Sequence, residues 1–204
     1  FMDELHPTAQ RVAAINTIVV QPDGSLLGMN NDGAGYIQSL RDADPTWRGD
    51  AGPALVLGAG GAARAIVVAL LDEGVPELRI TNRTLERAQA LAEAFGDRVK
   101  VVPWAQRNEA MVGVSLLVNT TTQGMHGQPP LDVALDALPA AAMVSDAIYI
   151  PMETPLLAQA RLRGHRTVNG LGMLLNQARP AFKAWFGVMP EITPELRAAI
   201  LATF

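Results

Sequence analysis

The chain has 204 residues, of which 49% are hydrophobic and 18% charged, with 18 glycines and 14 prolines, so it reads as a compact α/β protein of one large or two small domains and not as a disordered chain. Its net charge is −4 with no basic run, which argues against a nucleic-acid partner, and no apolar run approaches the roughly 18 residues of a membrane span. The absence of cysteine excludes disulfides and thiolate chemistry and fits a cytoplasmic location.

The first fifty residues read as short segments. Residues 1–12 are expected to form one or two helical pieces broken by Pro7, and because Phe1 falls inside such a piece, we expect upstream sequence to be missing. The β-branched run 15–20 and the strand 26–29, joined by a Pro-Asp-Gly-Ser turn, predict a hairpin. A helix is expected to begin near Asp32, and a polar connection follows it.

A glycine-rich turn follows the strand predicted at 54–57. It reads Gly58-x-Gly60-x-x-Ala63 and opens a helix, as in a dinucleotide-binding βαβ unit. Asn82 and Arg83 follow the second predicted strand, where an NAD site usually carries a carboxylate. A guanidinium can make two parallel hydrogen bonds to the 2′-phosphate of NADP, which a carboxylate would repel. Asn82 and Arg83 therefore predict NADP as the cofactor. The alternative is an ordinary arginine pair on the surface of a helix N-terminus.

Strands and helices continue to alternate beyond this unit. Predicted helices at 61–73, 84–95, 107–112 and 155–163 separate predicted strands at 54–57, 78–81, 99–102, 115–118, 143–147 and 166–168. This alternation predicts an α/β fold with a doubly wound parallel sheet, which binds ligands at the carboxyl ends of its strands. An apolar-striped helix at 173–186, with Pro180 inside it, and a final helix after Thr193 end the chain.

Short motifs are spread in order over nearly the whole chain. They lie at 14–17 (AINT), 28–35 (GMNNDGAG), 58–64 (GAGGAAR), 81–84 (TNRT), 119–125 (NTTTQGM), 146–149 (DAIY), 154–157 (TPLL) and 170–178 (GLGMLLNQA). In this combination the chain resembles the shikimate/quinate dehydrogenase family.

The resemblance implies an NADP-linked oxidoreductase that interconverts shikimate and 3-dehydroshikimate in aromatic amino-acid biosynthesis. It implies a Rossmann sheet beside the remnant of a second α/β substrate domain. We expect residues 1–33 to be the C-terminal part of that substrate domain, 34–170 the NADP-binding domain and 171–204 helices that return to the substrate domain.

The resemblance implies that Asp32 is catalytic and binds substrate, paired in the family with a lysine that helps to manage the hydroxyl proton. The alternative is a plain carboxylate at a helix start. Neither Lys100 nor Lys183 matches the family's lysine, whose position would lie upstream of Phe1, so we expect this chain alone not to turn over.

Three further residues are implied in substrate binding. Asn16 and Gln177 offer amides that suit vicinal hydroxyls, and Tyr149 ends a predicted strand near the expected nicotinamide. Each of the three residues also has a purely structural alternative. Asn16 would close the turn of its own hairpin, Gln177 would be an exposed glutamine on a helix, and Tyr149 would pack as a half-buried phenol. The implied cofactor residues are Gly58, Ala59, Gly60, Gly61, Ala62, Asn82, Arg83, Thr84, Arg87, Asn119, Thr120, Thr121, Ile148, Gly170 and Met173.

The remaining expectations concern partners and competing functions. The three histidines lack metal spacing, so no metal is expected. The partner is a small-molecule substrate, with no nucleic acid and no membrane, in a monomer or homodimer. Asn31, where the family usually has threonine, and Pro180 depart from the family pattern and leave open a quinate or other shikimate-analogue dehydrogenase. The sequence also leaves open a non-catalytic nucleotide-binding module and a different Rossmann enzyme, such as a tetrahydrofolate or glutamyl-tRNA reductase relative.

Overall fold

The structure is a computed structural model that describes residues 2–203, and it holds a large and a small β-sheet. The large sheet has six parallel strands in the order β6-β5-β4-β7-β8-β9. This order starts in the middle and winds outward both ways, so the predicted doubly wound α/β class is confirmed. The strands are β4 (Ala54–Leu57), β5 (Leu78–Thr81), β6 (Val99–Val101), β7 (Leu116–Asn119), β8 (Met143–Asp146) and β9 (Thr167–Val168).

Helices cover both faces of this sheet because its central strands are apolar on both sides. In β4, Leu55 and Leu57 join the apolar cluster under α5, whereas Ala54 and Val56 join the cluster under α3 and α4. Alternate residues of one strand thus serve two cores. The helices are α1 (Pro7–Val12), α2 (Asp32–Ala43), α3 (Gly61–Asp72), α4 (Leu85–Phe95), α5 (Pro155–Leu162), α6 (Gly170–Phe186) and α7 (Pro194–Leu201).

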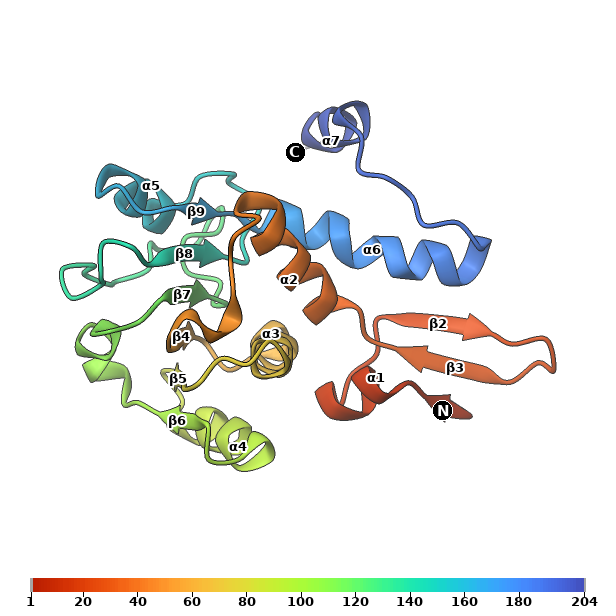
Figure 1. Cartoon of the computed structure of the whole chain (residues 1–204), viewed down its shortest axis with the longest axis horizontal. Coiled ribbons are helices and arrows are strands. Elements are labelled where there is room, and N and C mark those ends of the chain that lie inside the picture. Colours follow the sequence, from red (N-terminus) through yellow and green to blue (C-terminus); the bar gives the residue numbers. More distant parts are fainter. Residues whose placement is uncertain (1, 204) are drawn as a thin grey trace.

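Two helices connect the large sheet to the small one. α2 and α6 pack closely side by side, and α6 extends from the large sheet across to the small one (Figure 1). A Cβ added at Gly35 would lie 2.5 Å from the backbone nitrogen of Gln177, and one at Gly172 would lie 2.8 Å from the Cβ of Ser39. Because glycine has no side chain at these two positions, α2 and α6 can cross closely, which brings their residues together.

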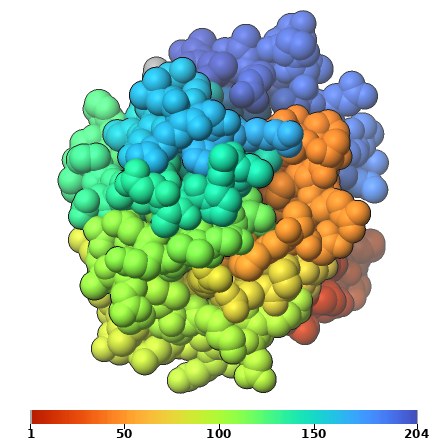
Figure 2. Space-filling model, turned by 60° about the vertical axis from the view of Figure 1, so that its left-hand side comes forward, coloured from red at the N-terminus to blue at the C-terminus, as the bar shows by residue number. Residues whose placement is uncertain are grey.

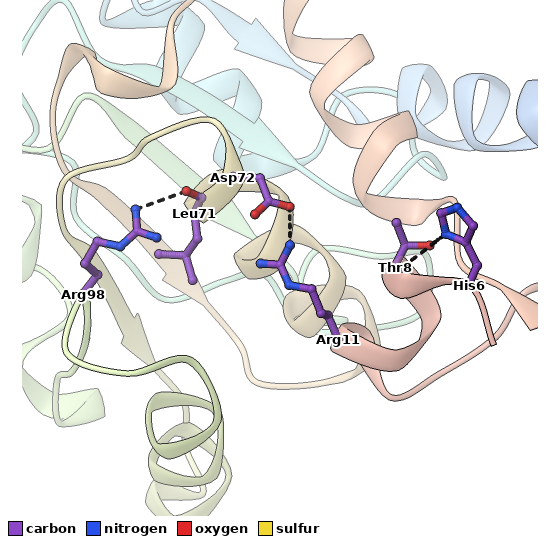
Figure 3. Close-up of polar contacts among 6 residues, drawn as sticks. All are labelled: His6, Thr8, Arg11, Leu71, Asp72 and Arg98. Atoms are coloured by element: carbon purple, nitrogen blue, oxygen red, sulfur yellow. Dashed lines mark hydrogen bonds and ion pairs between the residues drawn. The ribbon is translucent and has the colours of Figure 1, made fainter.

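The small sheet has the order β1-β3-β2, with β1 (Glu4–Leu5), β2 (Thr17–Val20) and β3 (Leu26–Met29). β2 and β3 form the predicted antiparallel hairpin. α1 follows β1 and is tied to α3 by an ion pair of 2.7 Å between Arg11 Nη1 and Asp72 Oδ2 (Figure 3). This ion pair links α1, which follows the first strand of the small sheet, to the helix that begins at the glycine turn.

Some predicted elements were wrong at the edges. Residues 4 and 5 form a strand and not a helix, because they pair in parallel with Leu27 and Gly28, which lie more than twenty residues away. Pro7 begins α1 instead of breaking it, since the first helical position needs no N–H donor. The helix expected at 107–112 is two 3-10 turns, Trp104–Gln106 and Glu109–Met111, and α6 begins at Gly170 and continues through Pro180. The expected helical conformation of Phe1 lies outside the described residues.

The connection between α2 and β4 contacts the segment that leads into β9. It contains a 3-10 turn, Gly49–Ala51, and its Asp44 accepts a hydrogen bond from Arg166 beside β9. Figure 2 shows this orange connection meeting the blue segment near the end of α5. Within residues 2–203, no helix combines the length and the apolar character that crossing a membrane requires.

Candidate active site

The glycine turn between β4 and α3 has the geometry of a phosphate-binding turn. Gly58 has φ +107°, which favours glycine, and a Cβ there would lie 2.5 Å from Thr120 Oγ1. A Cβ at Gly60 or Gly61 would meet nothing within 4 Å, so space is open beside the turn. α3 begins there without a side-chain cap, which leaves its first N–H groups and the positive end of its dipole available to an anion.

A pocket of about 180 Å³ lies at the carboxyl ends of β4, β5 and β7. Seven of its ten lining residues belong to the cofactor residues implied by the sequence; the other three are Trp104, Thr122 and Gln123. Asn82 Nδ2 donates to the carbonyl of Thr84 over 2.8 Å, which shapes the loop that carries Arg83. Arg83 and Arg87 are exposed and form no ion pair within residues 2–203. The lining residues are Gly58, Ala59, Gly60, Asn82, Arg83, Trp104, Thr120, Thr121, Thr122 and Gln123.

A buried polar network supports this pocket from below. Asn119 is fully buried; its Nδ2 donates to Asp146 Oδ1 over 3.0 Å, and its Oδ1 accepts from the backbone N–H of Thr121. Asp146 Oδ1 also accepts from the N–H of Ile148, and Oδ2 accepts from Thr154 Oγ1 over 2.7 Å. Burial raises the pKa of Asp146 to about 6 against these hydrogen bonds. Asn119 therefore holds the loop that lines the pocket, and its own side chain is occupied within the protein.

Three predicted substrate residues meet on the small-sheet side. Asn16, just before β2, donates from Nδ2 to Asp32 Oδ1 over 2.9 Å and to Gln177 Oε1 over 3.4 Å. Gln177 lies on α6, 145 positions after the first residue of α2, so tertiary packing alone brings these side chains together. Burial raises the pKa of Asp32, partly offset by the hydrogen bond from Asn16.

Purely structural roles fit these three residues to different degrees. The Asp32 side chain makes no capping hydrogen bond; Asn31 is the N-cap residue of α2, and the Asp32 carboxylate accepts from Asn16 instead. Asn16 does also close its own segment, because its Oδ1 accepts from Thr17 Oγ1 and from the N–H of Asn31. Gln177 is half-buried and bonded, not a freely exposed helix glutamine.

Asn31 is buried and does not project toward the open side of the cluster as a free amide. Its Nδ2 donates to Thr17 Oγ1 over 3.0 Å, and its backbone N–H donates to Asn16 Oδ1. The backbone contact with Asn16 does not depend on the side chain at position 31, and the Asn31 amide is linked to Asn16 through Thr17, whose Oγ1 donates to Asn16 Oδ1.

The remaining predicted cofactor and substrate residues lie around β8 and the start of α6. Ile148 is buried, and Tyr149 and Met173 are half-buried. A Cβ at Gly170 would collide with the carbonyl of Ala147, so the packing of α6 against the β8 loop already requires glycine there. A contact of these residues with a nicotinamide stays a prediction.

Sequence reasoning missed Trp104 and Gln123, which line the pocket, and the role of Asp146. Trp104 lines the pocket, and the signal for it was an aromatic side chain two residues after the strand predicted at 99–102. Asp146 was quoted only as part of a motif, although it joins the two loops beside the pocket. Among residues 2–203, no group of three or more His, Cys, Asp or Glu side chains is arranged to hold a metal ion.

Family models and known proteins match this chain. The family model described as shikimate/quinate 5-dehydrogenase matches residues 49–126, and the model of the shikimate 5′-dehydrogenase C-terminal domain matches 170–201. Shikimate dehydrogenase (NADP(+)) of Paramagnetospirillum magneticum is 53% identical over 201 residues, covering 98% of this chain and 73% of the relative. The same enzyme of Rhodospirillum rubrum is 53% identical, with 98% and 72% covered.

Solved structures agree with this. Shikimate 5-dehydrogenase of Thermus thermophilus, in complex with NADP(H) and shikimate, is 37% identical with a TM-score of 0.84, covering 98% of this chain and 73% of that one. Quinate dehydrogenase of Corynebacterium glutamicum, in complex with NAD, is 30% identical with a TM-score of 0.90, and the two chains are covered to 98% and 72%. The fold, the glycine turn and these relatives together show that the chain belongs to the shikimate/quinate 5-dehydrogenase family of oxidoreductases.

Proposed function

We propose that this protein is an NADP-dependent dehydrogenase that interconverts shikimate and 3-dehydroshikimate. The observation that carries the proposal is the cluster of Asn16, Asp32 and Gln177, three polar side chains from distant parts of the chain joined by hydrogen bonds. Their amide and carboxylate groups together can donate to and accept from the hydroxyls of a polyhydroxylated ring. The relatives that are 53% identical carry the name of this activity.

The residues around the glycine turn fit NADP. Gly60 and Gly61 leave room for the pyrophosphate, the N-terminus of α3 faces it, and Arg83 and Arg87 are available to a 2′-phosphate. When bound, the nicotinamide of NADP accepts or returns the hydride. We infer that the β8 loop, with Ile148 and Tyr149, and the first turn of α6, with Gly170 and Met173, border this half of the cofactor.

The protein must also manage one proton for each hydride. Asp32 is suited to hold the hydroxyl that loses or gains it, because the carboxylate accepts hydrogen bonds and is kept in place by Asn16. No lysine donates to Asp32 within residues 2–203; Lys100 lies on β6 and Lys183 on α6. We therefore propose that these 204 residues alone do not turn over.

The domain division belongs to the same proposal. Residues 1–33 hold the small sheet and Asn16, residues 34–170 the large sheet, and residues 171–204 most of α6 together with α7. In this division Asp32 and Gln177 both fall on the substrate side, while Arg83 falls on the cofactor side.

The test compares the 204-residue chain with the complete gene product. NADP⁺ and NAD⁺ binding is measured by calorimetry, and cofactor reduction is followed with shikimate and with quinate. We expect both proteins to prefer NADP⁺ and the complete protein to oxidise shikimate. Absence of NADP⁺ binding would overturn the cofactor assignment, a preference for quinate would overturn the substrate, and normal turnover by the 204-residue chain would contradict the lysine prediction.

A further inference from the structure

Trp104 lies where the adenosine half of a dinucleotide is expected. It is the first residue of the 3-10 turn that follows β6, and it lines the same pocket as Asn82 and Arg83. β6 pairs with β5, so the chain segments that carry Trp104 and Arg83 leave neighbouring strands at the same edge of the sheet. Because the residue after the second strand of a Rossmann fold contacts the adenosine ribose, a ring beside it is within reach of the base.

The indole of Trp104 is held in place by Arg107. The guanidinium carbon of Arg107 lies 4.9 Å from the indole ring centroid. Arg107 itself is fixed: Nε donates to the carbonyl of Asp132 and Nη2 to its carboxylate, each over 2.7 Å, and Nη1 donates to the carbonyl of Trp104. Its side chain is only 13% exposed. The cation covers the ring and orders it before any ligand arrives.

The pocket is of a size for one part of a ligand. Its volume of about 180 Å³ is below the roughly 300–1,000 Å³ that encloses a whole drug-sized molecule. A planar heterocycle fits such a space better than a dinucleotide does. The half-buried indole, which also packs against the apolar cluster under α5, supplies the flat apolar wall that a base needs.

We propose that Trp104 is the stacking surface for the adenine of NADP, a proposal that rests on the cofactor assignment above. Trp104 then recognises what NADP and NAD share, whereas Arg83 recognises the phosphate that only NADP carries. The two residues thus divide cofactor binding into an affinity contribution and a discrimination contribution. Replacing Trp104 should therefore change the affinity for both cofactors, whereas replacing Arg83 should change the preference for NADP over NAD.

The experiment measures NADP⁺, NAD⁺ and adenosine 2′,5′-bisphosphate binding to the wild-type chain and to Trp104→Ala, Trp104→Phe and Arg83→Ala. Trp104→Ala is expected to weaken all three ligands by roughly 5- to 100-fold, as for loss of a base–aromatic stack, with the NADP⁺/NAD⁺ ratio unchanged. Trp104→Phe retains an aromatic face and should recover most of the affinity. Arg83→Ala should instead lower the ratio. Tryptophan fluorescence should be quenched by the bisphosphate in the wild type and much less in Trp104→Phe.

The outcomes separate the two proposals. If the wild type binds adenosine 2′,5′-bisphosphate and folded Trp104→Ala binds it equally well, the stacking role is overturned and the cofactor assignment stands. If the quenching persists in Trp104→Phe at full strength, the reporter is Trp47 or Trp185 and stacking is again overturned. If the wild type binds neither the bisphosphate nor NADP⁺, the proposed function itself fails. Thermal melts of each variant show whether lost binding reflects lost folding.

Discussion

Asp146→Asn is the substitution with the most direct consequence for stability. The carboxylate lies at the end of β8, is 1% exposed, and accepts from Asn119, Ile148 and Thr154. An asparagine there keeps the oxygen that accepts from Asn119 and Ile148 and turns an N–H toward Thr154. The substitution thus removes the charge and keeps most of the network.

Burial raises the pKa of Asp146 from the ordinary 3.8 to about 6. Because the folded state binds the proton more tightly than the unfolded state, this group's contribution to stability is present at low pH and is lost as the pH rises through about 6. A difference of about two pH units corresponds to about 3 kcal/mol in the free energy of unfolding, and about half of it develops between pH 8 and pH 5.

Urea denaturation followed by circular dichroism, at pH 8 and pH 5, measures this contribution. Wild type should gain between about 1 and 2 kcal/mol relative to Asp146→Asn on going from pH 8 to pH 5. Asp97→Asn makes the same chemical change at an exposed position and serves as the matched control. The reasoning would be refuted if the stability difference between wild type and Asp146→Asn were the same at both pH values or changed in the opposite direction. Either result would mean that burial does not raise the pKa of this carboxylate.

Three further predictions concern the site and the helix crossing. Arg83→Ala should weaken NADP⁺ binding by roughly 1.5–3 kcal/mol and leave NAD⁺ binding unchanged in calorimetry, and equal losses for both would contradict a 2′-phosphate contact. Asp32→Asn in the complete protein should lower kcat by about 10²- to 10⁴-fold, and because burial raises the pKa of Asp32, the wild-type rate should fall with decreasing pH at values above the usual aspartate range. Gly35→Ala should lower the free energy of unfolding by about 1–3 kcal/mol in urea melts, since its Cβ would collide with the backbone of Gln177. Gly61→Ala, whose Cβ would meet nothing within 4 Å, should not lower it. Equal stability of both variants would contradict the close α2–α6 crossing.

Much of the large sheet followed from local pattern. The strands predicted at 54–57 and 78–81 match β4 and β5, because an apolar run ending in a glycine turn or a polar residue leaves few other structures. The residues that we expect to bind NADP come from the same pattern, since the backbone conformation of Gly58 and the charge of Arg83 are properties of single positions; their contact with the cofactor stays a prediction.

Distant contacts decided what local pattern could not. Residues 4 and 5 became a strand only because β3 lies beside them, and two residues are too few to show a period. Trp104 joined the pocket because β6 is the neighbour of β5, an order that no spacing along the chain reveals. The sequence by itself determined the fold class and the kind of cofactor site, through patterns that repeat within a few residues. Only the tertiary structure brought Asn16, Asp32 and Gln177 together and placed Asp146 under two loops, because those contacts depend on how helices and strands far apart in the chain pack against one another.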